Sequence, residues 1–135
     1  MSNLKLRLTL HKKERLNKKS IIDKLFAKGK SFSYGNFYVK WDYTDNISFS
    51  PAQILFNASK KKIKSAVKRN IIKRLIKECY RKNKYIIYKA LEKNNKNIAI
   101  VIIYNGSKII DYEEVNKNVL SILNKISDIN ENIDK

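Results

Sequence analysis

Apolar residues first repeat at helical spacing between residues 17 and 29. Asn17 or Ser20 can cap the start of this helix, and Gly29 can end it. Residues 1–16 are basic and partly apolar without a clean period, so we expect an arm that lies along the surface. The apolar positions of the predicted helix are Ile21, Ile22, Leu25 and Phe26.

Alternation with a period of two then predicts two β-strands. The first covers residues 37–43, where Phe37, Val39 and Trp41 alternate with more polar residues. The second covers residues 52–58, after a turn that ends at Pro51. We expect the two strands to pair as an antiparallel hairpin. Phe37, Val39 and Trp41 then belong to the core, because side chains of a strand alternate between its faces.

The longest helical pattern follows at residues 65–83. Arg69, Lys73 and Lys77 repeat every four residues on one side, and Asn70 lies among them. The helix is therefore expected to pack one side on the sheet and to present fixed cations on the other. Its apolar side consists of Ile72, Leu75, Ile76 and Cys79.

The C-terminal third of the chain predicts a strand and a helix. Residues 98–104 form a nearly continuous apolar run, as in a strand that is covered on both faces. Asp111, followed three residues later by Glu114, is typical of a capping box that opens a helix. We therefore expect one α+β domain over residues 17–126, of αβββ-like or, preferably, αββαβα order, with a basic arm at 1–16 and a frayed polar tail at 127–135.

The charge of the chain is strongly unbalanced. Thirty Lys and Arg residues stand against 12 Asp and Glu residues, which gives a formal net charge of +18. The basic residues concentrate in segments 1–30 and 60–84, whereas the remaining segments are close to neutral or mildly acidic. Because such self-repulsion costs stability, a polyanionic partner such as a nucleic acid is expected at these two segments.

Several other classes of protein are disfavoured. With Cys79 as the only cysteine and His11 as the only histidine, neither an internal disulfide nor a Cys/His zinc site can form. A self-contained nuclease needs carboxylates around a metal or a histidine acid–base pair, and the acids here are scattered. We expect no catalytic and no metal-binding residues in the chain. No apolar run suits a membrane span or a signal segment, so a cytoplasmic protein without a membrane partner is expected.

The segment SKKKIKSAVKRNIIKRLIKECYR resembles the signature segment of the bacterial ribonuclease P protein component. That family has an Ala-Val-x-Arg-Asn-Arg-x-Lys-Arg pattern, in which Ile71 replaces the second Arg and Lys64 stands where a Gly is common. Leu16, Phe26, Gly29 and Phe37, and the segment DYEEVNKNVLSIL, also agree, so the resemblance covers about residues 7–126. The residues that match the pattern itself are Ala66, Val67, Arg69, Asn70, Lys73 and Arg74.

The resemblance implies a fold of αβββαβ type with a further helix, and a mixed sheet with the signature helix in a left-handed crossover. It implies a protein subunit of ribonuclease P that helps a catalytic RNA to remove the 5′ leader of precursor tRNA. The catalytic RNA and precursor tRNA are the expected partners. No cofactor is expected to bind stably to the protein, and Mg²⁺ is expected to be held chiefly by RNA. The alternative is a general RNA-binding or ribosome-associated protein without a role in tRNA maturation.

The resemblance also implies two sets of site residues. A cleft for the leader is expected at Ile22, Phe26, Tyr38 and Lys40, although Phe26 fits the core equally well. Ile71 borders the apolar flank of its helix, so we expect it to be buried. The residues expected to bind the catalytic RNA are Lys60, Lys61, Lys62, Lys68, Arg69, Asn70, Lys73, Arg74, Lys77 and Arg81.

Overall fold

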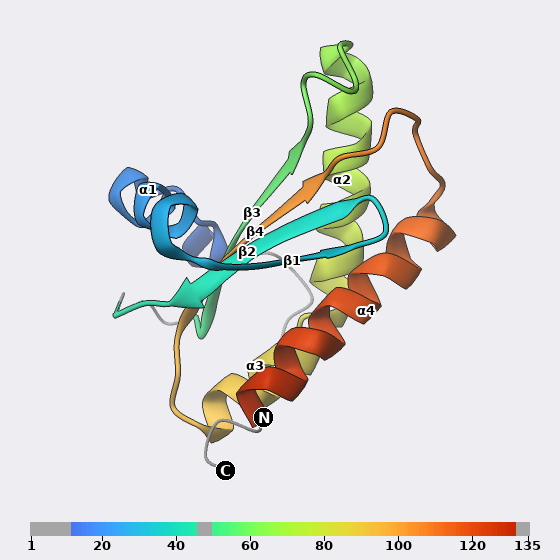
Figure 1. The fold of residues 1–135 in the computed structure, drawn as a ribbon. Helices are drawn as coiled ribbons and strands as arrows, with labels where there is room; N and C mark the ends of the chain where they lie inside the picture. The colour runs from blue at the N-terminus through green and yellow to red at the C-terminus, as the bar shows by residue number, and fades with distance from the viewer. Residues whose placement is uncertain (1–11, 46–49, 132–135) are drawn as a thin grey trace.

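A computed structural model describes residues 12–45 and 50–131, so most of the predicted N-terminal arm lies outside the described residues (Figure 1). The elements are, in chain order, the 3₁₀ helix η2 (Lys12–Glu14), α1 (Lys19–Lys28), β1 (Lys30–Tyr34), β2 (Phe37–Tyr43), β3 (Ala52–Ala58), α2 (Ala66–Asn83), α3 (Tyr85–Lys93), β4 (Ile98–Tyr104) and α4 (Tyr112–Glu131).

The four strands form one mixed sheet in the order β1-β2-β4-β3. β2 pairs antiparallel with β1 and β4, whereas β3 pairs parallel with β4. The expected α+β class with a mixed sheet is therefore confirmed. The αββαβα order preferred from the residue pattern lacks β1, whereas the αβββαβ order with a further helix, which the resemblance implies, is confirmed. Phe32 and Tyr34 of β1 do alternate with Ser31 and Ser33, but the pattern spans only five residues, which are mostly exposed.

The predicted antiparallel hairpin of residues 37–43 with 52–58 is also wrong. β4 lies between these two strands, and the hairpin is formed by β1 and β2, with Gly35 at a φ of 57° in the turn. The apolar run of β4 explains its position, because a central strand is covered on both faces and paired on both edges. The chain passes from β3 to the parallel strand β4 through α2 and α3. The handedness of this crossover stays a prediction.

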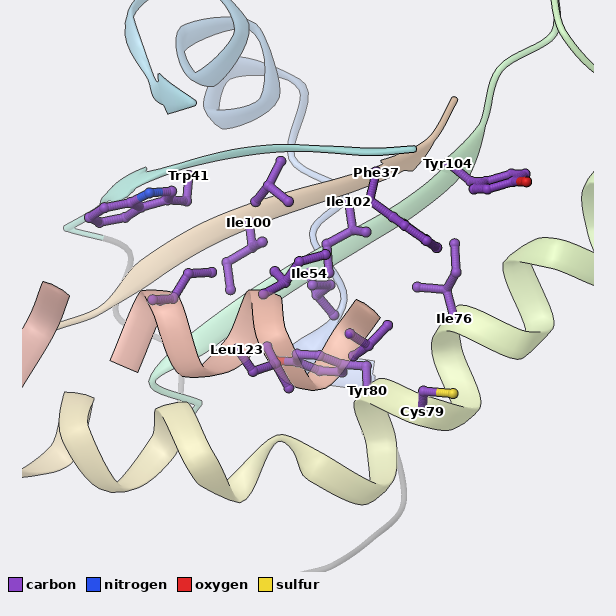
Figure 2. Close-up of a cluster of buried hydrophobic side chains, with 14 of the residues drawn as sticks. Phe37, Trp41, Ile54, Ile76, Cys79, Tyr80, Ile100, Ile102, Tyr104 and Leu123 are labelled. Carbon is purple, nitrogen blue, oxygen red and sulfur yellow. The ribbon is translucent and has the colours of Figure 1, made fainter. Parts of the chain in front are cut away.

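Helices cover both faces of the sheet (Figure 1). α1 lies on one face, and α2, α3 and α4 lie on the other. In the larger core, Phe37, Trp41 and Ile100 of the sheet face residues of α2 and α4, as Figure 2 shows. The predicted core positions Phe37, Val39 and Trp41 are confirmed. A smaller core under α1 consists of Leu16, Leu25, Ala99 and Val101.

The helix boundaries follow from local caps, of which the sequence predicts some. Gly29 ends α1 as expected, since a Cβ there would come within 2.4 Å of the Leu25 carbonyl oxygen. The start of α1 is different from the prediction. Lys18 occupies the N-cap position, and its side chain forms no capping hydrogen bond. Asp111 Oδ1 accepts a hydrogen bond from the Glu114 amide at 3.0 Å, which confirms it as the cap of α4.

Both predicted domain ends are corrected. Leu16 is buried, and its amide donates to the Ile54 carbonyl at 2.9 Å, so the folded domain begins before residue 17. α4 continues to Glu131, so a frayed tail is wrong for residues 127–131, while residues 132–135 lie outside the described part. Asn130 explains the extension, because it is buried and its Oδ1 accepts from the Tyr43 hydroxyl at 3.1 Å. Because this end of the helix is held by polar contacts, the apolar repeat in the sequence does not predict it.

Candidate nucleic-acid interface

A groove of about 580 Å³ lies between the sheet and the N-terminal half of α2. We call it the α2 groove. Its lining comes from β2, from the ends of β3 and β4, from the segment after β3 and from α2. The lining residues are Tyr38, Asn57, Ala58, Ser59, Lys60, Arg69, Asn70, Lys73, Ile103 and Asn105.

The strand register builds the floor of the α2 groove. Tyr38 lies opposite Ile103 across β2 and β4, and Ile103 lies opposite Asn57 across β4 and β3. The three side chains therefore form a row on one face of the sheet, the face that carries α1. α1 packs on Ala99 and Val101 farther along this face, as part of the smaller core. The row at Ile103 is left open to the groove.

The wall of the α2 groove carries the cations. Arg69 and Lys73 lie one helical turn apart, and Asn70 stands beside them. Nη1 of Arg69 donates to the carbonyls of Ile63 and Lys64, at 2.9 Å each. These two bonds fix the guanidinium against the segment that leads into α2. Its other N–H groups remain available for a ligand in the groove.

The groove cations have no acidic partner among the described residues. The ion pairs in this part of the chain join Lys19 to Asp23, Lys30 to Asp42, Arg81 to Glu78 and Lys84 to Glu14. Lys60, Arg69 and Lys73 take part in none of them. The wall is therefore a set of free positive charges beside an amide, an arrangement that suits phosphates and polar base edges.

The structure brings together only part of the residues predicted to bind RNA. Lys60, Arg69, Asn70 and Lys73 line the α2 groove. Arg81 is paired with Glu78, so its charge already has an acidic partner within α2. The remaining predicted residues lie outside the groove, exposed at Lys61, Lys62, Lys68 and Arg74 and half-buried at Lys77.

Ile71 is 40% exposed, so its predicted burial is wrong. The neighbouring Ile72 and Ile76 are fully buried and take the positions that face the core. Ile71 lies about 100° around the helix from Ile72, which carries its side chain out of the interior. The spacing of apolar residues alone did not show that Ile72 is buried and Ile71 is exposed.

The four residues predicted for a leader cleft have different surroundings. Tyr38 lines the α2 groove, and Phe26 is 44% exposed, which removes it from the core. Lys40 Nζ donates to the Phe26 carbonyl at 3.2 Å and to the Gly29 carbonyl at 3.5 Å. These carbonyls belong to the C-terminal end of α1, where a cation is favoured. Ile22 is half-buried and packs on the smaller core.

Ile103 connects the two predicted sites. It packs against the smaller core under α1, and it also lines the α2 groove. The sequence did not single out Ile103, Asn57, Ser59 or Asn105. Asn57 and Asn105 are polar residues at the ends of strands. This position indicates a functional site only when the strand order is known, because that order places both strand ends beside α2.

Neither a metal centre nor a membrane span is present in the described part of the chain. Within residues 12–45 and 50–131, no three His, Cys, Asp or Glu side chains come together as metal ligands would. Among the same residues, no helix has the length and apolar character that crossing a bilayer requires.

Comparison with known proteins gives a consistent result. The family model described as Ribonuclease P matches residues 10–127. The ribonuclease P protein component of Chlorobium phaeobacteroides is 34% identical over 108 residues, which are 74% of each chain. The corresponding protein of Porphyromonas gingivalis is 28% identical over 118 residues, 87% of this chain and 86% of the relative.

Solved structures show the same fold. The RNase P protein of Thermotoga maritima superposes with a TM-score of 0.66 at 24% identity, over 84% of this chain and 97% of that one. The RNase P protein of Staphylococcus aureus gives a TM-score of 0.65 at 24% identity, over 84% and 94%.

Proposed function

Because this chain belongs to the ribonuclease P protein family, we propose that the α2 groove and the exposed side of α2 bind the catalytic RNA and the precursor tRNA. The protein is a component of an endoribonuclease ribonucleoprotein, and its role is in the 5′ processing of tRNA. The family match gives no support to a general RNA-binding protein without this role. We also propose that the protein is located in the cytoplasm.

The free cations beside an open sheet face carry this proposal. Lys60, Arg69 and Lys73 line the same groove and lack acidic partners in the described part of the chain. They can hold successive phosphates, and the guanidinium of Arg69 can contact two phosphate oxygens at once. Asn70 adds a donor and an acceptor, which can contact a base edge or a 2′-hydroxyl.

We propose that the single-stranded leader crosses the α1 face of the sheet towards this wall. Phe26 and Tyr38 offer aromatic rings on which unpaired bases can stack with little regard to sequence. Lys40 is held by the α1 carbonyls at 3.2 and 3.5 Å, so its first role is to fix the end of α1 beside Phe26. Its charge still adds to the attraction for the leader backbone.

The protein then acts by binding and orienting RNA rather than by breaking the phosphodiester bond itself. Magnesium bound in the ribonucleoprotein would supply the chemistry of water activation and charge stabilisation. The described residues do not form a ligand set for such an ion, so no step is assigned to this chain's side chains. We propose that the RNA holds the magnesium and that the protein binds no cofactor stably.

Reconstitution tests the proposed function. Purified protein, the catalytic RNA of ribonuclease P from the same organism and a precursor tRNA are combined at low magnesium. We expect the protein to accelerate removal of the leader, because its cations reduce the repulsion between two polyanions. The protein without the RNA should not cleave. If the protein leaves the rate of the RNA unchanged, the proposed function is wrong.

Leader binding is tested with Phe26→Ala. Because Phe26 is 44% exposed, the substitution should change the free energy of unfolding little. It should raise the KM for a precursor with a long leader by about fivefold or more, since one stacked base contributes about 1–3 kcal/mol. A precursor with a one-nucleotide leader should be unaffected. Tyr34→Ala is the matched control, because Tyr34 is 42% exposed on β1, outside the α2 groove. An equal loss for both precursors would exclude a leader contact.

A further inference from the structure

Two aliphatic side chains lie exposed on α2 beside the groove wall. Val67 is 70% exposed and Ile71 is 40% exposed. They are four residues apart, so they are neighbours on the helix surface. We call them the Val67–Ile71 patch. Ile72 and Ile76 already fill the side of α2 that faces the core, so the patch contributes little to the fold.

Free cations surround the patch. Lys68 and Arg74 lie on α2, three residues before and after Ile71, and Lys64 lies in the segment that leads into the helix. All three are exposed, and none forms an ion pair among the described residues. An occupant of the patch must therefore present a dense negative charge next to an apolar surface.

An unpaired nucleotide has both properties, because its phosphates are anionic and the face of its base is largely apolar. A second copy of this chain is disfavoured, since each copy carries a net charge of +18. An aliphatic side chain forms no hydrogen bonds, so it can contact a nucleotide only through the face of the base or the C–H groups of the ribose.

We propose that the Val67–Ile71 patch packs against an unpaired nucleotide of the catalytic RNA, while Lys64, Lys68 and Arg74 hold the adjoining phosphates. This proposal rests on the proposed function and adds an apolar contact to the phosphate contacts of the cations. Phosphate contacts release counterions and weaken steeply with salt, whereas burial of apolar surface does not. The patch should therefore contribute affinity that salt does not remove.

The test compares dissociation constants for the catalytic RNA over a range of salt concentrations. The variant Val67→Ala/Ile71→Ala should bind about fivefold more weakly at every salt concentration, with an unchanged slope of log K against log salt. The variant Lys68→Ala/Arg74→Ala should instead show a shallower slope. Ile109→Ala is the matched control, because Ile109 is 42% exposed outside α2 and should not change binding.

Alanine favours helices, so the first variant should keep its fold, and circular dichroism and thermal unfolding check this. The inference fails if this folded variant binds as tightly as the parent or if its slope changes. It also fails if the parent forms dimers that the variant does not form, since the patch would then be a self-association site. A parent protein that does not bind the RNA at all would instead overturn the proposed function, which separates the two outcomes.

Discussion

The Arg69 side chain makes structural hydrogen bonds and also lines the proposed RNA-binding groove. Its Nη1 holds the carbonyls of Ile63 and Lys64, and the same guanidinium lines the α2 groove. Arg74, one turn and a half further on, is exposed outside the groove. The sequence marked both as members of the same motif, because a motif records residue types and spacing but not the contacts that each side chain makes in the fold.

This difference predicts unequal effects of a conservative substitution. Arg69→Lys keeps the charge but loses the planar group that donates to two carbonyls, so affinity for the catalytic RNA should fall by about tenfold. Arg74→Lys keeps the charge at an exposed site and should change affinity about twofold or less. Binding titrations of both variants check this. Similar losses for the two variants would show that charge alone matters at Arg69.

Cys79 shows how burial changes the chemistry of one side chain. The sequence predicts a buried thiol, and the structure confirms it. Burial raises the pKa of the Cys79 thiol from 9.0 to about 11. The neutral thiol is therefore favoured in the folded protein, and this residue should react slowly with alkylating reagents near neutral pH.

The raised pKa also predicts a pH dependence. The stability that Cys79 contributes is fully present below pH 9.0 and is lost as the pH rises through about 11. The free energy of unfolding of the parent should thus fall by up to about 2–3 kcal/mol more than that of Cys79→Ala over this range. Urea unfolding at the two pH values measures the difference. Parallel pH profiles for the two proteins would contradict the assignment.

At the scale of elements, a buried ion pair joins the N-terminal segment to the junction of α2 and α3. Lys84 Nζ lies 2.6 Å from Glu14 Oε2, and both side chains are less than a tenth exposed. The Tyr88 hydroxyl donates to the same oxygen, and burial raises the pKa of Tyr88 far above its usual value, so this donor keeps its proton. The network holds η2 against the helices that carry the candidate interface.

Removal of one partner should be costly. Lys84→Met leaves the Glu14 carboxylate buried without its cation and should lower the free energy of unfolding by about 3–5 kcal/mol. The double variant Lys84→Met/Glu14→Leu should be less affected, because both charges are gone. Lys19→Met, which breaks the exposed pair with Asp23, is the control and should change stability little. A double variant as unstable as Lys84→Met would contradict this explanation.

The sequence predicts the elements of this fold better than their partners. α2, β2, β3, β4 and α4 all lie within a few residues of the predicted ranges, because their apolar residues repeat with the period of a helix or a strand. The pairing of β2 with β3 was wrong. The order of the strands depends on contacts between segments that lie far apart in the chain, and the period of each single strand does not contain that information.

At the scale of the whole molecule, the net charge of +18 makes binding depend strongly on salt. If the unpaired cations of α2 and the preceding segment engage phosphates, the dissociation constant for the catalytic RNA should rise about 100- to 1000-fold between about 0.05 and about 0.2 M salt. Lys61→Ala/Lys62→Ala should make this dependence shallower without changing the fold, since both side chains are exposed. Affinity that is constant over this range would exclude phosphate contacts as the main source of binding.

The sequence by itself determined the class of fold, the helix that carries the cations, the polyanionic partner and the family. Each of these depends on composition, on local period or on a motif within one segment. Only the tertiary structure decided which cations share a groove, that Tyr38 and Ile103 form its floor, that Phe26 and Ile71 are exposed and that Arg81 is already paired. These properties depend on strand order and on contacts between distant segments, which a local pattern of residues does not contain.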